Sequence, residues 1–434
     1  MIFVYNFLQA VLLITAFPFL LLIVLGKKKY RSRISDRLGI GLEQKITDMN
    51  PGKKKIIWIH GLSVGEVTSA LPLVKGLREE MEQVCIVFSA STRTGMRIAL
   101  EKIRPHVDLV VAAPLDLLPV VNRSIRLIRP DMFILVETDF WPNWVDRLQQ
   151  SAIPLVLVNG RISPSSFTRY RRFNYFFKPL FRSFALLSMQ TESDAAQMRQ
   201  LGVNAERVKT LGNLKYDTNL YRGNVNENNP AAPDPRIPEN ARIWVCGSTH
   251  PGEEETIITA FSRLLRTRKD IVLVLAPRDP DRRNEIRKLL TAHGMQSMRR
   301  TCPADPAAPI LILDTLGELA GAYRQARVAF IGGSLVDRGG HNPLEAAAYG
   351  VPVLFGPHMD DFMEIGRDLT ECGGALSVDS PAKLENAVRR ILDDEAVHQR
   401  MSDAAYNLVK RNSGVIQNHL RELRSLLLAD AGES

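Results

Sequence analysis

A carboxylate beside a glycine-containing turn is the first feature of this sequence that could do chemistry. Glu66 closes the segment His60–Glu66, which contains two glycines and directly follows an apolar run. A carboxylate held at the end of a buried strand can act as a general base toward a substrate hydroxyl. Ser63 and Glu66 also have the spacing of a helix capping box, so a purely structural role is the alternative.

Further charged side chains follow other apolar runs. Glu137 and Asp139 come after one run, where two acids can bind a metal, hold a cation or cap a helix. Lys215 precedes a Pro- and Asn-rich stretch, and Arg278 follows a run in the second half; both are placed to meet an anion such as phosphate. Residues 279–281 match a short DxD metal motif, but the central proline indicates a turn, so we predict no metal site.

A glycine-rich stretch in the second half indicates phosphate binding. It runs through Gly332–Ser334 and Gly339–Ala347, where Asn342 reads as a helix cap, Pro343 as the first helical residue and Glu345 as the third. Backbone N–H groups at such a helix start can bind phosphate. Glu345 can accept hydrogen bonds from ribose hydroxyls or complete a capping box. Neither a GxGxxG after the first strand nor a P-loop is present, which excludes the common dinucleotide and NTPase motifs.

Composition divides the chain into two unlike halves. The 434 residues are 45% hydrophobic, enough for two domains with their own cores. Up to residue 221 there are 30 Lys/Arg against 18 Asp/Glu, and afterwards 26 against 29. The basic first half should face an anionic partner: a phosphorylated lipid, a membrane surface or a nucleic acid. Four dispersed cysteines form no CxxC pair, which favours a reducing compartment over disulfides or zinc.

Short Val- and Ile-rich runs alternate with helical stretches, which is typical of parallel sheets covered on both faces. We predict two doubly wound α/β domains facing a cleft, joined by a linker at residues 222–240. Ligands should bind at the carboxyl ends of the strands. The predicted strands are Ile56–His60, Val84–Ser89, Leu109–Ala112, Met132–Val136 and Leu155–Val158, then Ile243–Cys246, Ile271–Leu275, Ile310–Leu313, Val328–Ile331 and Val353–Phe355.

Two segments of the first half suggest contact with a membrane. Residues 1–26 hold a nearly uninterrupted apolar run and are followed by a basic run, which predicts a single anchor with the body on the cytoplasmic side; a shallow interfacial helix is the alternative. Residues 167–181 interleave aromatic and basic side chains. That composition suits a lipid headgroup, stacking on nucleic acid, or a helix with a packed aromatic side and a solvated basic side.

Taken in order, these motifs resemble the 3-deoxy-D-manno-octulosonic acid (Kdo) transferases of lipid A and lipopolysaccharide biosynthesis, glycosyltransferase family 30. The resemblance implies a GT-B fold: an acceptor-binding domain at 27–221, a CMP-Kdo-binding domain at 241–392, and a helical segment at 393–434. The motifs that carry it are His60–Glu66, Glu137–Asn143, Gly212–Asp217, Pro277–Arg278, Leu316–Glu318, Gly332–Ser334 and Gly339–Ala347.

The resemblance also implies roles for particular residues. Glu66 matches the general base, and Glu137 and Lys215 match positions assigned to transition-state stabilisation. The sequence departs from the family at Asp279, where a His is common, and at Met359–Phe362, where Thr-Phe-Asn-Phe is usual; both departures concern fine contacts of the nucleotide site. The expected nucleotide-sugar contacts are Pro277, Arg278, Leu316, Gly317, Glu318, Gly333, Ser334, Asn342, Pro343, Leu344 and Glu345.

The function implied is transfer of Kdo from CMP-Kdo to the lipid A precursor lipid IVA at the cytoplasmic face of a bacterial inner membrane. It would proceed by one inverting displacement, without metal or other cofactor, and with membrane lipids as further partners. The alternatives are a UDP-sugar-dependent GT-B enzyme of the cell envelope or a related epimerase, a membrane-tethered module that only binds, and a nucleic-acid binder. No recognised nucleic-acid motif supports the last of these. How many Kdo units are added is left open.

Overall fold

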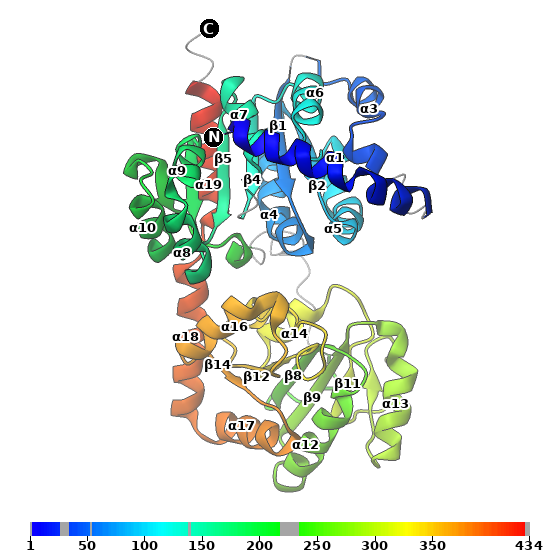
Figure 1. Ribbon diagram of the computed structural model, residues 1–434. Coiled ribbons are helices and arrows are strands. Elements are labelled where there is room, and N and C mark those ends of the chain that lie inside the picture. Colours follow the sequence, from blue (N-terminus) through cyan, green and yellow to red (C-terminus); the bar gives the residue numbers. More distant parts are fainter. Residues whose placement is uncertain (1, 27–33, 53, 138–139, 218–233, 430–434) are drawn as a thin grey trace. The chain divides into compact units, whose positions relative to one another are not determined.

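The computed structural model describes residues 2–26, 34–52, 54–137, 140–217 and 234–429, and the side chains of 16–26 are not described. The chain forms two compact units, one made of Met1–Thr218 with Gly414–Ser434 and the other of Asn219–Ser413. Each is a parallel sheet with helices on both faces (Figure 1).

The first unit is built on a seven-stranded sheet with the order β3-β2-β1-β4-β5-β6-β7, in which every pairing is parallel. Its central strands consist almost wholly of buried apolar residues, as burial on both faces requires. The strands are β1 Lys55–Gly61, β2 Val84–Ala90, β3 Leu109–Ala112, β4 Met132–Val136, β5 Leu155–Gly160, β6 Leu186–Met189 and β7 Val208–Thr210.

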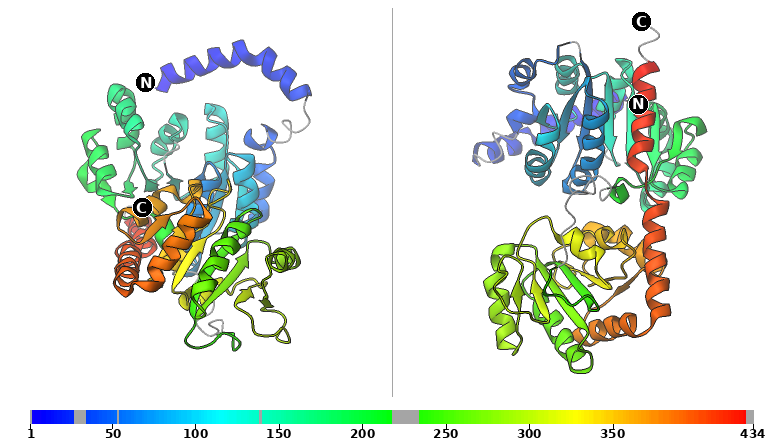
Figure 2. Two further views of the ribbon diagram at one scale, coloured as in Figure 1. Left: turned by 90° about the horizontal axis from the view of Figure 1, so that it is seen from below. Right: turned by 180° about the vertical axis from the view of Figure 1, so that it is seen from behind.

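Helices cover both faces of this sheet, and the last of them comes from the far end of the chain. Helix α19, Val415–Ala429, packs beside α4 (Figure 2). Two side chains, His419 and Asp217, link this C-terminal segment to the rest of the unit. His419 Nε2 lies 2.7 Å from Ser188 Oγ, and Asp217 accepts from the backbone N–H of Gly414 and Ile416 at 3.0 and 2.6 Å. The other helices are α1 Ile2–Gly26, α3 Leu42–Met49, α4 Val64–Glu80, α5 Arg93–Ile98, α6 Leu118–Ile128, α7 Pro142–Gln150, α8 Pro164–Arg172, α9 Asn174–Arg182 and α10 Glu192–Gln200.

The second unit repeats the plan with the strand order β10-β11-β9-β8-β12-β13-β14, again all parallel. Its strands are β8 Arg242–Thr249, β9 Ile271–Pro277, β10 Met298–Arg299, β11 Ile310–Ile312, β12 Val328–Ile331, β13 Val353–Phe355 and β14 Ala375–Ser377. Its helices are α12 Glu253–Thr267, α13 Arg283–Ala292, α14 Leu319–Arg324, α15 Leu344–Ala347, α16 Met363–Glu371, α17 Pro381–Asp393 and α18 Glu395–Arg411.

The predicted α/β architecture is confirmed, and each of the ten predicted strands falls on an observed one. Strands β6, β7, β10 and β14 were not predicted from the sequence. Most of the predicted linker 222–240 lies outside the described residues. In its described end, Arg236 donates to the carbonyl oxygens of Arg299 and Cys302, each at 2.9 Å, which holds this end on the second unit. All four cysteines are free thiols.

Helix α1 differs from the expectation of an anchor. Tyr5 donates its O–H to Asp116 Oδ2 at 2.8 Å, and Gln9 donates to the Asp116 carbonyl at 2.8 Å. Asn6 donates to Asn143 Oδ1 at 2.8 Å, so polar side chains of α1 hold it on the first unit. Among the residues that the structure describes, no helix is long and apolar enough to span a bilayer, so the membrane-spanning anchor predicted for residues 1–26 is not supported.

Candidate active site

In the first unit, the candidate catalytic residues follow the two strands where the order of the sheet reverses. β1 and β4 are neighbours, but the chain runs from β1 outward to β2 and from β4 outward to β5. Segments that leave neighbouring strands in opposite directions open a crevice at their carboxyl ends. Glu66 lies in the helix that follows β1, and Glu137 comes directly after β4.

Glu66 does form the predicted capping box at the start of α4. Ser63 donates its backbone N–H to Glu66 Oε2 at 2.9 Å, and its hydroxyl contacts the same oxygen. The turn is packed closely, because a Cβ on Gly95 would lie 3.2 Å from the Ser63 carbonyl carbon. The Glu66 side chain is only partly buried, so the cap fixes a carboxylate that solvent still reaches.

Glu137 sits in an unusual backbone conformation, with a φ of +66°. A non-glycine residue in the left-handed region costs on the order of 1–3 kcal/mol and is frequent at functional sites. Its side chain is 9% exposed. One carboxylate oxygen accepts from Ser69 at 3.4 Å and from Asn159 Nδ2 at 3.3 Å, and the other lies 3.8 Å from Arg161 Nε. The neighbouring residues 138–139, including the predicted Asp139, lie outside the described part.

Asn159 connects Glu137 to the turn that carries Lys215. It is fully buried at the end of β5, with a φ of +57°. While its Nδ2 donates to Glu137, its Oδ1 accepts the backbone N–H of Leu214 at 3.0 Å, at the start of the 3-10 turn Leu214–Asp217. The sequence analysis missed Asn159, although a polar residue directly after an apolar run was the available signal. Glu137 and the Lys215 turn are thus tied to one amide, while their catalytic roles stay predictions.

The glycine-rich loop of the second unit is organised by a carboxylate that sequence reasoning also missed. Glu253, fully buried at the start of α12, accepts backbone N–H groups from Gly333 at 2.7 Å, Ser334 at 3.0 Å and Leu335 at 2.9 Å. It also accepts the N–H of His250 at 2.9 Å. These amides therefore bind the protein's own carboxylate, and contact of Gly333 and Ser334 with a nucleotide stays a prediction.

Glycine is required where this loop meets the neighbouring strand ends. A Cβ on Gly332 would lie 2.3 Å from the Ser248 carbonyl oxygen, and one on Gly356 would lie 2.2 Å from that of Ser334. Ser334 Oγ accepts the Gly356 N–H at 2.7 Å, so the loops after β12 and β13 touch through their backbones. β8 and β12 mark the point of strand reversal in this sheet, so these loops line the expected ligand edge.

The predicted phosphate-binding helix is shorter than expected. Asn342 Oδ1 accepts the Leu344 N–H at 3.1 Å, which confirms its capping contact. Helix α15 begins at Leu344, one residue after the predicted start at Pro343, and ends at Ala347. A helix of four residues has little macrodipole, and its first backbone N–H, that of Leu344, is bonded to Asn342, so phosphate binding at this helix stays a prediction. Burial, followed by the charge of Glu345, raises the pKa of the neighbouring Tyr323 well above its usual value.

The remaining predicted contacts follow β9 and β11. The Arg278 side chain is exposed just after β9, while its backbone N–H donates to Thr249 O at 3.0 Å. Leu316 is 81% exposed beside Gly317, which has a φ of +88°. Glu318 pairs with Arg300 at 3.0 Å, and these two help to line a small pocket with Val274, Leu313 and Gln325. Arg300 is a further residue that the sequence did not single out.

Two histidines meet at the same edge of the second sheet. The Nε2 atoms of His250 and His341 are 2.8 Å apart, with nearly parallel rings. An N–H···N bond needs one ring to donate and the other to accept, so at least one of the two is neutral. Burial lowers the pKa of His250, which favours its neutral form.

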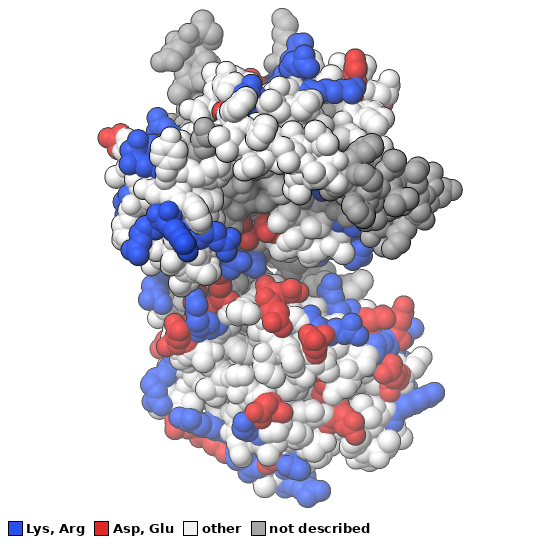
Figure 3. All heavy atoms as spheres, in the orientation of Figure 1, with Lys and Arg blue, Asp and Glu red and all other residues white. Residues whose placement is uncertain are grey.

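The basic and aromatic stretch at residues 167–181 covers most of α8 and most of α9. Figure 3 shows Lys and Arg gathered on the face over these helices. Phe167, Tyr170, Phe176 and Phe177 pack against the core, which confirms the helix with a packed aromatic side. Tyr175 is 90% exposed among the arginines, so the outer side is not purely basic.

Comparisons with known proteins bear on both units. Residues 32–218 match the family model of 3-deoxy-D-manno-octulosonic-acid transferase, and residues 254–408 match that of glycosyl transferases group 1. The chain is 32% identical to the 3-deoxy-D-manno-octulosonic acid transferase of Haemophilus influenzae over 98% of this chain and 99% of that protein. It is 29% identical to the enzyme of the same name from Chlamydophila psittaci, over 86% of each chain.

A solved structure extends the comparison to the fold. The UDP-GlcNAc 2-epimerase of Neisseria meningitidis aligns over 84% of this chain and all of its own, with a TM-score of 0.51 and 12% identity, which bears on the fold alone. Two parallel α/β sheets and this likeness show a GT-B fold, and the two family models make the chain a glycosyltransferase. With a relative matched along nearly its whole length, and with each family model falling on one unit, this chain belongs to the 3-deoxy-D-manno-octulosonic acid (Kdo) transferase family.

Proposed function

We propose that this protein transfers Kdo from CMP-Kdo to lipid IVA, a lipid A precursor, by a single displacement that inverts the anomeric carbon. The strongest support is the position of Glu66 and Glu137, which follow the two strands at the point where the order of the first sheet reverses. The chain that carries them matches a Kdo transferase over 98% of its length. The first unit then binds the acceptor and the second unit binds the donor.

Glu66 acts as the general base in this proposal. Its carboxylate takes the proton of the acceptor hydroxyl as that oxygen attacks the anomeric carbon. Ser63 holds the Glu66 carboxylate through its backbone N–H at 2.9 Å, which places the group before the acceptor arrives. Because a capping contact engages only part of the carboxylate, the other oxygen is available to the acceptor hydroxyl.

Glu137 and Lys215 stabilise the transition state. The anomeric carbon gains positive character as CMP leaves, and a buried carboxylate such as Glu137 favours that charge. Lys215 supplies a cation for the carboxylate of the Kdo sugar. Asn159 fixes the relation between them, since it bonds both Glu137 and the Leu214 N–H.

The donor nucleotide binds at the carboxyl edge of the second sheet. The exposed guanidinium of Arg278 holds the phosphate near the start of α15, and Glu345 accepts from the ribose. Pro277 and the turn Leu316–Glu318 border the base. CMP is a good leaving group once its charge is held, so neither a general acid nor a metal is needed for the reaction.

We also propose that the first unit meets the cytoplasmic face of the inner membrane through α1. Phe3 is 79% exposed, and Phe7, Leu8 and Leu12 are exposed on the same helix. An apolar helix face beside a basic surface suits an interface with anionic lipids, which would bring a membrane-embedded acceptor to Glu66. Co-sedimentation with anionic phospholipid vesicles should fall for a Phe7→Asp/Leu12→Asp variant; unchanged binding would contradict this part.

The donor class is tested by supplying the purified protein with lipid IVA and either CMP-Kdo or UDP-sugars, and weighing the lipid product. A mass increase of one or more Kdo units, formed only with CMP-Kdo, is expected. A product formed from a UDP-sugar would favour the other GT-B activity instead. Binding of the donors without any product would favour a module that only binds.

A further inference from the structure

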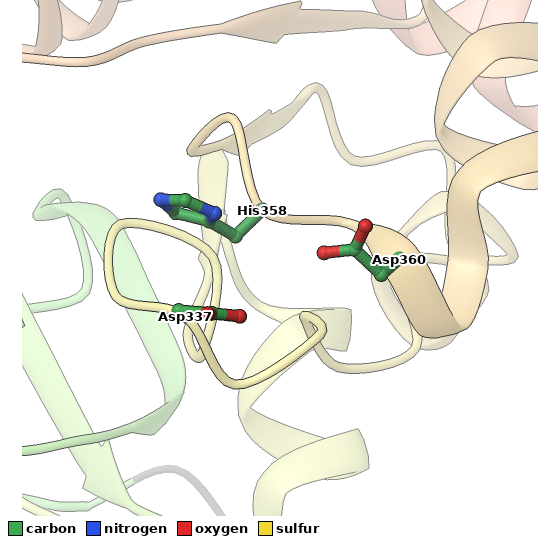
Figure 4. A group of neighbouring side chains, drawn as sticks. All are labelled: Asp337, His358 and Asp360. Atoms are coloured by element: carbon green, nitrogen blue, oxygen red, sulfur yellow. The ribbon is translucent and has the colours of Figure 1, made fainter.

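Three metal-ligating side chains converge beside the glycine-rich loop of the second unit. Asp337 comes from the loop after β12, His358 from the segment after β13, and Asp360 from the start of the 3-10 turn Asp360–Phe362. One ligand atom of each lies within 4.8 Å of the others. Figure 4 shows the three side chains as neighbours on two segments of the chain, with the carboxylates of Asp337 and Asp360 directed toward each other and the imidazole ring of His358 turned away from Asp360.

These side chains have no other evident structural task. Within the described parts of the chain, none of the three makes a hydrogen bond or an ion pair with another residue. Two carboxylates held this close repel one another unless a positive charge lies between them. Asp337 and Asp360 are exposed and His358 is half-buried, so water reaches the two carboxylates, and a cation placed among the three side chains would meet one imidazole and two carboxylates.

The backbone that carries these ligands is held firmly. His358 donates its N–H to Ser334 O at 2.9 Å, and Asp361 donates its N–H to Gly339 O at 2.9 Å. Gly340 closes the loop by donating to Gly333 O at 2.9 Å. A Cβ on Gly339 would lie 2.8 Å from Asp361 Oδ2, so the two segments approach too closely for a side chain there. Loop movement is thus restrained, and only side-chain rotation is needed to close the site.

The donor set selects the kind of ion. An imidazole nitrogen with two carboxylate oxygens suits borderline ions such as Zn²⁺, Co²⁺ or Mn²⁺ better than Mg²⁺ or Ca²⁺, which take oxygen ligands. Around tetrahedral Zn²⁺, with bonds of about 2.0–2.2 Å, neighbouring ligand atoms lie roughly 3.3 Å apart. The present separations of up to 4.8 Å therefore need to shrink by up to about 1.5 Å.

We propose that Asp337, His358 and Asp360 bind one divalent transition-metal ion, which clamps the loop 335–340 to the segment 357–360. Three protein ligands leave a fourth position for water or a ligand oxygen. The ion stabilises the loops that border the predicted nucleotide site and takes no part in sugar transfer. The proposal therefore stands independently of the function proposed above.

Titration of the purified, metal-free protein with Co²⁺, followed by its visible absorption, tests the site. We expect one tightly bound ion per chain, with affinity at least about tenfold weaker in His358→Gln and in Asp360→Asn. Zn²⁺ should raise the melting temperature of the parent protein and not that of these variants. His293→Gln, which alters an exposed histidine of the same unit, is the matched control and should bind Co²⁺ normally.

Two results would overturn the proposal. One is the absence of saturable, stoichiometric Co²⁺ binding by the parent protein. The other is stoichiometric binding that both His358→Gln and Asp360→Asn retain at full strength, which would place the ion elsewhere, for example at the pair His250 and His341. Circular dichroism of each variant establishes that it is folded, so a loss of binding reports on the ligands themselves.

Discussion

Replacing Glu253 by Gln should release the glycine-rich loop of the second unit. The buried carboxylate accepts four backbone N–H groups, from His250, Gly333, Ser334 and Leu335, at 2.7 to 3.0 Å. A Gln side chain keeps one oxygen and turns its NH₂ group toward donors, so about two bonds are lost. At about 1.5–3 kcal/mol for each bond to a charged acceptor, the loss is about 3–6 kcal/mol.

Hydrogen exchange measured by mass spectrometry reports this change locally. Peptides that cover residues 331–338 should exchange at least roughly a hundredfold faster in Glu253→Gln. The reason is that the free energy of local opening of this loop falls by at least about 3 kcal/mol. Calorimetry should show the same destabilisation in the unfolding of the second unit. Glu255→Gln, at an exposed position of the same helix, is the control and should change stability by less than about 0.5 kcal/mol. Unchanged exchange in Glu253→Gln would refute the view that this carboxylate organises the loop.

Three further changes test other parts of the account. Asn159→Ala leaves the Leu214 N–H buried without its acceptor and puts Ala at a positive φ, so urea unfolding of the first unit should lose about 2–4 kcal/mol; a loss below about 1 kcal/mol would contradict the linking role. Arg278→Ala should weaken CMP binding in calorimetric titration about 10- to 100-fold at unchanged stability, since the side chain is exposed; equal affinity would remove Arg278 from the donor site. Burial lowers the pKa of His419 to about 4. Between about pH 6.5 and pH 4 the imidazole is therefore protonated in the unfolded chain and neutral in the folded protein. The His419 side chain should therefore lower the free energy of unfolding by up to about 3 kcal/mol between pH 6.5 and pH 4, and His419→Phe should lack this contribution. An equal pH dependence in both proteins would contradict the burial of a neutral His419.

The sequence predicted the strands that carry a long apolar signal and missed those that do not. β3, β4, β12 and β13 begin and end where the runs of Val, Ile, Leu and Phe predicted. The missed strands are as short as some of the predicted ones, but each contains a polar or charged residue, so none is an uninterrupted apolar run. Ser188 interrupts β6, and its buried hydroxyl contacts His419, which lies 231 residues away in the sequence.

The sequence predicted a hydrogen-bonded motif made within four consecutive residues, but not the contacts between residues that are far apart in the chain. The Ser63 and Glu66 capping box is set by four consecutive residues, so its spacing was sufficient. Glu253 is one of three consecutive glutamates in the first turn of α12. Their interaction with the helix dipole is enough to explain acidic residues at that position, so the sequence does not single out Glu253. Three of its four N–H donors, at Gly333, Ser334 and Leu335, come 80 or more residues later, and only the fold brings them to Glu253. The same holds for Asn159 and Leu214, which lie 55 residues apart.

The most direct test of the central claim is CMP release from CMP-Kdo in EDTA, with and without lipid IVA, by the parent protein, Glu66→Gln and Glu79→Gln. Glu79 is an exposed residue on the same helix and serves as the control. We predict acceptor-dependent release by the parent and by Glu79→Gln, and a rate about 10²- to 10⁴-fold lower for Glu66→Gln. Release that ignores the acceptor, or that Glu66→Gln sustains at the parental rate, would contradict base-catalysed Kdo transfer by this chain.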